Sequence, residues 1–140
     1  MLRAVQVGFR QGALHLLAAV TVLLVRAILT IGSYRIVLLM IPRGAFRTAH
    51  PELARRTSCA VARISRIVPR AHCLTQALSV QMILALRGYA SEVKIGVRQS
   101  ADGAFEAHAW LMSGMFVATG GTPADLANFT ALTELSVRRT

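Results

Sequence analysis

The period of the hydrophobic pattern changes once in the second half of the chain, and this change limits the folds open to it. In residues 74–85 apolar side chains recur at helical spacing, and the Arg-Gly pair that follows supplies a last-turn cation and a C′ glycine. From residue 92 onward apolar and polar residues alternate, as in half-buried strands. A helix followed by a short antiparallel meander predicts an α+β domain.

Three strands are predicted in this meander. SEVKIGVR (91–98) and AFEAHAWLM (104–112) both alternate, and an Asp-Gly turn separates them. In the second of these segments His108 and Trp110 share one face. A Ser-Gly pair then turns the chain, so that MFVAT (115–119) is expected to return as a third strand.

The N-terminal half is dominated by the apolar run ALHLLAAVTVLLV (13–25). A spanning helix needs about 20 apolar residues, and such a window would include Arg26, at roughly 2.5–3.5 kcal/mol near the bilayer centre. We therefore expect a helix that is buried or lies at a membrane surface, with a spanning helix or a secretory signal as the alternatives. Pro42-Arg43-Gly44 is expected to end this region as a turn.

A second helix is predicted from Pro51 to Val68, because proline fits the first helical turn and apolar residues follow at helical spacing. Cys59 lies in the middle of this helix among alanines and valines. A free cysteine in such a place usually behaves as a small buried hydrophobe, so we expect Cys59 to be structural.

Composition restricts the cofactors and the compartment. A chain of 140 residues suits one domain, and its two cysteines make no disulfide framework, which favours a reducing, cytoplasmic setting. The spacings CxxC and HxxxH, which would indicate a zinc site, do not occur. Neither a metal nor an organic cofactor follows from the residues.

The charge of the chain is strongly positive and unevenly placed. The formal net charge is +10, and residues 1–70 hold eleven arginines against one acid, Glu52. Such a field favours an acidic partner, an anionic membrane surface or nucleic acid. The low aromatic content of 6%, without aromatic and basic residues interleaved, counts against nucleic acid.

Cys73 and His108 are the candidates for chemistry. Cys73 opens the predicted helix after PRAH (69–72), where unpaired backbone amides and the helix dipole stabilise a thiolate and can hold an oxyanion. A histidine on a strand packed against that helix could take the thiol proton and donate it to a leaving amine. His72 is a rival base, although neighbours along a helix do not face each other.

These residues carry a family resemblance. The run PRAHCLTQALSVQMILALRGYASEVKIGVRQ (69–99) together with GAFEAHAW (103–110) resembles the lasso peptide B2 family. Members of that family are leader peptidases of lasso-peptide biosynthesis with a transglutaminase-like, papain-like core and a Cys-His-Asp triad. The resemblance implies Cys73 as nucleophile and His108 as base. It also implies an Arg-rich helical region at 1–68 joined in one compact unit to a transglutaminase-like peptidase core at 69–140.

The third member of the triad departs from the family pattern. Where the family's acid usually lies, this chain has Gly120-Gly121, and Asp125 is the nearest acid downstream. Thr122-Pro123-Ala124-Asp125 also resembles a helix start, with an N-cap threonine, proline at N1 and an acid at N3. Asn128 could instead orient the imidazole through its amide, as in papain-like enzymes. We name Asp125 as the candidate acid, with Asn128 or no third residue as the alternatives.

The resemblance implies a function and partners. The chain would be a cysteine endopeptidase that removes the leader from a lasso precursor peptide, with a separate small leader-binding protein, while a macrolactam synthetase closes the freed core. Two other functions stay open. One is acyl or glutaminyl transfer on the same fold, and the other is a non-catalytic basic protein that binds a membrane surface or nucleic acid.

Overall fold

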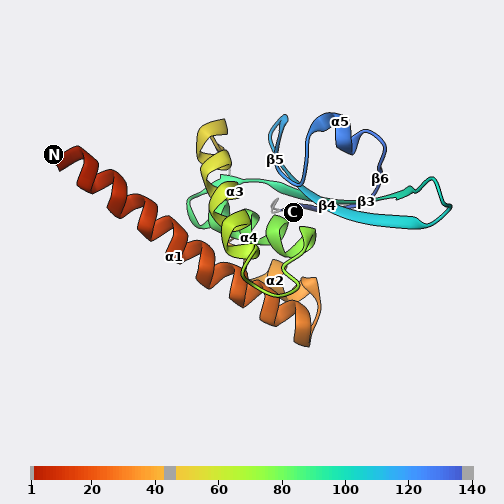
Figure 1. Cartoon of the computed structure of the whole chain (residues 1–140), viewed down its shortest axis with the longest axis horizontal. Helices are drawn as coiled ribbons and strands as arrows, with labels where there is room; N and C mark the ends of the chain where they lie inside the picture. Colours follow the sequence, from red (N-terminus) through yellow and green to blue (C-terminus); the bar gives the residue numbers. More distant parts are fainter. Residues whose placement is uncertain (1, 43–46, 137–140) are drawn as a thin grey trace.

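The computed structural model describes residues 2–42 and 47–136, and the side chains of 5–42 and 47–132. A long helix α1 (Leu2–Ile31) is followed by α2 (Tyr34–Met40), α3 (Pro51–Ser65) and α4 (Cys73–Leu86). Figure 1 shows these helices grouped on one side of an antiparallel sheet. The α+β class predicted from the sequence is confirmed. Only Pro42 of the predicted turn at 42–44 lies within the described residues.

The sheet has four strands in the order β5-β4-β3-β6. Their bounds are β3 (Glu92–Gln99), β4 (Phe105–Ser113), β5 (Phe116–Thr119) and β6 (Thr130–Ser136), and the short helix α5 (Pro123–Leu126) lies between the last two. The three strands predicted from alternation are confirmed. The fourth, β6, was not predicted, and it pairs with the free edge of β3.

A second, much smaller pairing ties the two halves of the chain together. Strand β1 (Arg47–Thr48) lies parallel to β2 (Tyr89–Ala90), which directly follows α4. The guanidinium of Arg47 lies 5.9 Å from the centre of the Tyr89 ring. Residues 47 and 48, shortly before α3, are therefore fixed beside the segment that leads from α4 into the sheet.

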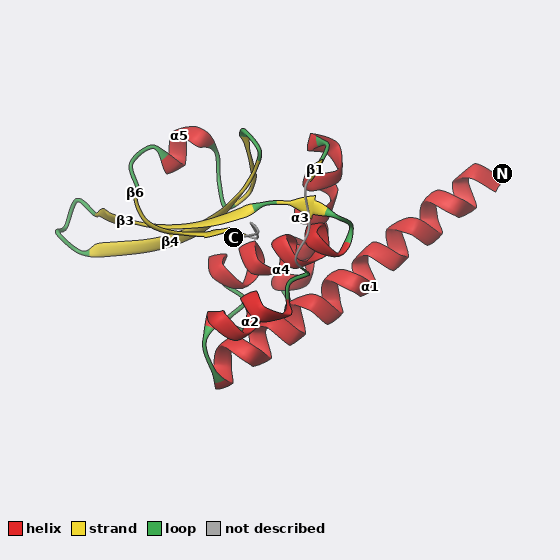
Figure 2. Cartoon of the chain, turned by 180° about the vertical axis from the view of Figure 1, so that it is seen from behind, coloured by secondary structure: helices red, strands yellow, loops and turns green. Residues whose placement is uncertain are grey.

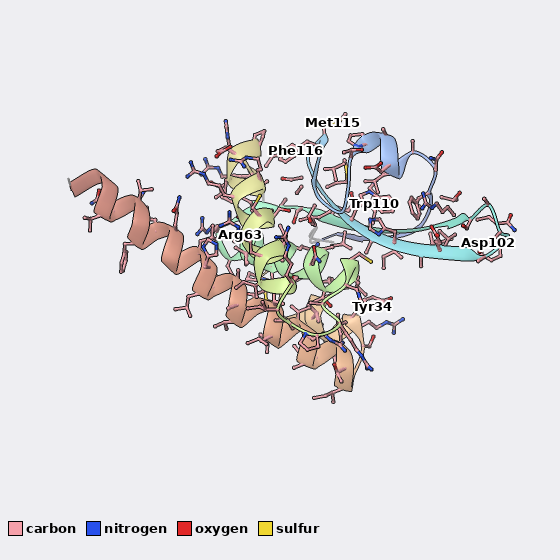
Figure 3. The ribbon with its side chains drawn as sticks, in the orientation of Figure 1. Tyr34, Arg63, Asp102, Trp110, Met115 and Phe116 are labelled. Atoms are coloured by element: carbon pink, nitrogen blue, oxygen red, sulfur yellow. The ribbon has the colours of Figure 1, made fainter. Side chains whose placement is uncertain are left out.

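The main core lies between the helices and one face of the sheet (Figure 2). Helix α4 is its centre, since ten of its fourteen residues are buried. Strand β3 contributes Val93, and strand β4 contributes Ala109 and Leu111. Because side chains alternate along a strand, His108 and Trp110 face the other way, toward α5. Figure 3 shows Trp110 on that side of the sheet.

Helix α3 corrects one expectation about the cysteines. Cys59 is exposed, not buried. The buried residues of this helix include Thr57, Ala60 and Val61, and the position of Cys59 follows Arg55 by one turn, on the polar side. The prediction failed because successive residues of a helix are turned by 100°, so Cys59 faces solvent although its neighbours Ala60 and Val61 are buried.

Candidate active site

Cys73 is the first residue of α4 and is half-buried. Residue His72, the N-cap, makes no side-chain hydrogen bond to the first turn of the helix. The first backbone amides of a helix have no partners within it, so they remain free to bind an anionic oxygen. Cys73 therefore lies where the sequence predicted it, beside backbone donors suited to an oxyanion.

The loop before Cys73 is tightly folded. Arg70 has a φ angle of +60°, which places a non-glycine residue in the left-handed region. The His72 amide donates to the Arg70 carbonyl at 2.9 Å, and the Gln76 side-chain amide donates to the Ala71 carbonyl at 3.3 Å. Backbone strain of this kind often marks functional sites. This strain is not predictable from the sequence, because position 70 is an arginine and not a glycine or asparagine.

His108 lies on β4, on the face turned away from α4. Its Nε2 hydrogen-bonds with the carbonyl oxygen of Gly120. Since a carbonyl can only accept, this geometry places the proton on Nε2 and leaves Nδ1 as the basic nitrogen. The ring also lies 6.4 Å from Trp110 and 5.4 Å from Phe129, centre to centre.

Two glycines make room for this aromatic cluster. A Cβ on Gly96, which pairs with His108 across the strands, would lie 2.8 Å from the Trp110 ring. A Cβ on Gly120 would lie 2.5 Å from the Cβ of Trp110, and its φ of +108° also favours glycine. Glycine therefore stands where the family pattern leads one to expect an acid, and its backbone carbonyl receives the imidazole N–H.

Asp125 caps a helix. Thr122 is the N-cap of α5, and its hydroxyl accepts from the Asp125 amide at 3.2 Å. The Asp125 carboxylate in turn accepts from the Thr122 amide at 3.0 Å and the Thr122 hydroxyl at 2.6 Å. These hydrogen bonds from Thr122 lower the pKa of Asp125. The predicted helix start is confirmed, and the predicted orienting role of Asp125 stays a prediction.

An open hollow of about 510 Å³ lies beside His108. Its lining includes Asp125 and Phe129, together with an ion pair in which the Nε of Arg98 lies 2.7 Å from Glu106. The Arg98 guanidinium also lies 4.8 Å from the centre of the Phe129 ring. The structure thus brings His108 and Asp125 to one hollow, although they share no direct hydrogen bond. Asn128 is exposed and lines a neighbouring hollow.

Cys73 and His108 belong to different sides of the sheet. Cys73 packs against the helical core, and it does not line the hollow beside His108. Within residues 5–42 and 47–132, no hydrogen bond joins the thiol to the imidazole. In the same part of the chain, no group of three or more His, Cys, Asp and Glu side chains is placed to hold a metal ion. The pairing of Cys73 with His108 stays a prediction.

Comparison with known proteins supplies the family. The sequence model described as "Transglutaminase-like superfamily" matches residues 16–134, which include α4 and the whole β3–β5 meander. The chain belongs to this superfamily. The superfamily generally includes cysteine peptidases and transferases, in accord with a cysteine at the start of a core helix. No curated protein and no solved structure matches the chain significantly.

Proposed function

We propose that this transglutaminase-like chain is a cysteine endopeptidase that removes the leader from a ribosomally made lasso precursor peptide. The observation that carries the proposal is Cys73 at the first position of a buried helix, within a sequence pattern that resembles the lasso peptide B2 family. Superfamily membership supports the reaction class, and the resemblance supports the substrate.

The proposed reaction has two steps. The Cys73 thiolate attacks the carbonyl of the last leader residue, and amides of the first turn of α4 bind the oxyanion. The peptide C–N bond then breaks, His108 protonates the departing amine of the core peptide, and a thioester remains on Cys73. Water attacks that thioester, which frees the leader as a carboxylic acid and restores the thiol.

This mechanism requires a change at His108. Its imidazole now faces α5, on the side of the sheet away from Cys73, and hydrogen-bonds with Gly120. Both this hydrogen bond and the local backbone of β4 must therefore change before the ring can exchange a proton with Cys73. Binding of the precursor and the separate leader-binding protein supplies the energy for that rearrangement in our proposal. The isolated chain should therefore cleave poorly, and cleavage should rise when the leader-binding protein is added.

The test is cleavage of the precursor followed by mass spectrometry, with and without the leader-binding protein. We expect one cut at the leader–core junction, which Cys73→Ala abolishes and Cys59→Ala, the matched change at the other cysteine, leaves intact. His108→Ala should abolish it as well, whereas His72→Ala should retain it. Cleavage that survives Cys73→Ala would refute the proposal.

Two other results would assign a different function to the chain. If an added amine captures the acyl group in place of water, the chain is an acyl transferase on the same fold. If neither product forms with the matched partner present, the protein is a non-catalytic basic binder, and Cys73 is part of the core.

A further inference from the structure

The outward face of α1 is apolar along its described length. Large apolar side chains recur there at the spacings of a single helix face. We call this set the outward stripe; its members are 56–89% exposed, and they are Val5, Phe9, Leu16, Val20, Leu23 and Ile31. Figure 1 shows the N-terminal half of α1 extending well beyond the rest of the molecule.

No charged side chain interrupts the outward stripe within residues 5–31. Arg10 and Arg26 lie off this face, because they stand about 100° from its midline on a helical projection. The Nε of Arg26 instead donates to the Pro69 carbonyl at 3.2 Å. An outward helix face in water is normally polar, and a long apolar surface marks a site that is covered in use.

The opposite face of α1 is part of the protein core. Ala18, Val22 and Val25 are fully buried in the cluster that also contains α3 and α4. The segment Val5–Ile31 is long and apolar enough to cross a membrane; an 18-residue window within it has a mean hydropathy of 2.3, and 22% of that window is buried. If α1 crossed a bilayer, Ala18, Val22 and Val25 would have to leave the core. We therefore infer that α1 stays packed against the domain.

The positive charge of the chain favours an anionic surface as the partner that covers the stripe. Residues 1–70 carry eleven arginines and one acid, and the chain has a net charge of +10. Four exposed arginines with no ion pair among the described residues lie on α1, α2 and the end of α3: Arg10, Arg35, Arg63 and Arg66. A second copy of so basic a chain would be repelled, whereas anionic lipid headgroups attract it.

We propose that α1 lies in the plane of an anionic lipid bilayer. The outward stripe inserts at the boundary between headgroups and acyl chains, and Arg10 beside the stripe meets the lipid phosphates. The rest of the domain remains above the surface, and its net positive charge attracts it to the bilayer. This mode needs no rearrangement of the core, because the inserted residues are those already exposed. The proposal stands independently of the peptidase function. If that function also holds, cleavage takes place at a membrane surface.

The test is flotation of the full chain with vesicles of phosphatidylcholine containing about 30% phosphatidylglycerol, compared with phosphatidylcholine alone. We expect the wild type to float with the anionic vesicles, and more weakly at high salt. The stripe variant Phe9→Gln/Leu16→Gln/Leu23→Gln should lower the partition coefficient about tenfold or more, since binding scales with inserted apolar area.

Two matched variants separate the stripe from general hydrophobicity and charge. Phe105→Gln/Met115→Gln removes two apolar side chains that are at least about as exposed as the stripe but lie at the start of β4 and in the β4–β5 turn, and it should float like the wild type. Arg10→Gln/Arg35→Gln should reduce the preference for anionic vesicles. The stripe residues are exposed, so thermal unfolding of the stripe variant should match that of the wild type.

Three results would overturn the proposal. The first is a wild type that does not float, and the second is a stripe variant that floats as well as the wild type. The third is resistance of the bound protein to alkaline carbonate, which removes surface-bound proteins and leaves spanning ones. Light scattering tests the alternative that a second copy of the chain covers the stripe. That alternative would be shown by a wild type that does not float but forms a dimer, and by a stripe variant that is a monomer.

Discussion

The two faces of strand β4 differ in how their side chains are held. On one face Ala109 and Leu111 join the large apolar core around α4, the helix that begins with Cys73. On the other face His108 and Trp110 meet a few residues of the segment that follows β5, above all Gly120 and Phe129. The proposed nucleophile thus stands on the most deeply packed element, and the proposed base lies under a short segment.

This difference bears on how the site would work. Burial of α4 fixes Cys73 and the backbone amides beside it, which is what an oxyanion site requires. The segment over His108 contains only the four-residue helix α5, and its cap residues Thr122 and Asp125 are exposed. Elements with few buried contacts open at low free energy. The segment over His108, the proposed base, is therefore the part that can rearrange when substrate binds.

The largest expected effect is on the core face. Leu111→Ala should lower the free energy of unfolding by about 2–5 kcal/mol, because Leu111 is fully buried and its removal leaves a cavity against α4. Urea denaturation followed by circular dichroism measures the change. Met115→Ala is the control, since Met115 is 98% exposed and its loss should stay within about 0.5 kcal/mol of the wild type. A Leu111→Ala loss under about 1 kcal/mol would contradict the described core.

The difference between the two faces of β4 also explains which features could be predicted from the sequence. The helix at Cys73 and the strands that follow have strong periodicity, and hydrophobic burial enforces that periodicity. Their existence and the division of β4 into two faces were therefore predictable, but not that His108 would lie on the face away from α4. The capping box at Thr122 and Asp125 was also predictable, because its residue types and spacing are local. Both depend on interactions that a short window of sequence contains.

The rest of the site depends on contacts between distant residues. Strand β6 was missed because its pairing with β3 joins residues that are 33 to 44 positions apart in the sequence. The contact of Phe129 with His108 was not predicted for the same reason, since the two residues are far apart in the sequence. In the sequence, Gly120-Gly121 marks only the absence of an acid, whereas the structure shows that the close approach of Trp110 is the physical reason for Gly120. An aromatic residue two positions after the histidine, with a Gly-Gly pair downstream, was the available signal.

The intermediate effect concerns the segment over His108. Gly120→Ala should lower the free energy of unfolding by about 1–3 kcal/mol, through overlap with Trp110 and a strained φ. It should also change the ¹⁵N shifts of the His108 ring, because the Gly120 carbonyl moves away from Nε2. Chemical denaturation and NMR of the histidine rings measure the two effects.

Gly121→Ala is the matched control for that prediction. Gly121 has a φ of +127°, so it shares the backbone strain, yet the nearest atom to an added Cβ is 3.7 Å away. The difference between the two variants isolates the contact with Trp110. If both variants lose the same stability and leave the His108 shifts unchanged, then Trp110 does not hold the Gly120 carbonyl against the imidazole.

The smallest expected effect is at the cap of α5. Thr122→Ala should lower the free energy of unfolding by about 1 kcal/mol, the usual effect of losing an N-cap hydroxyl. Asp125→Asn should destabilise less at neutral pH. Hydrogen bonds from Thr122 hold the pKa of Asp125 below its unfolded value, so its contribution is full above the unfolded value and is lost as pH falls through the folded pKa. The wild type and Asp125→Asn should therefore have converging stabilities in urea denaturation at acid pH.

Cleavage assays on folded Asp125→Asn test whether this carboxylate also orients His108. A loss of cleavage far beyond the loss of folded protein would make Asp125 the orienting acid. His108 would then be held by more than aromatic packing.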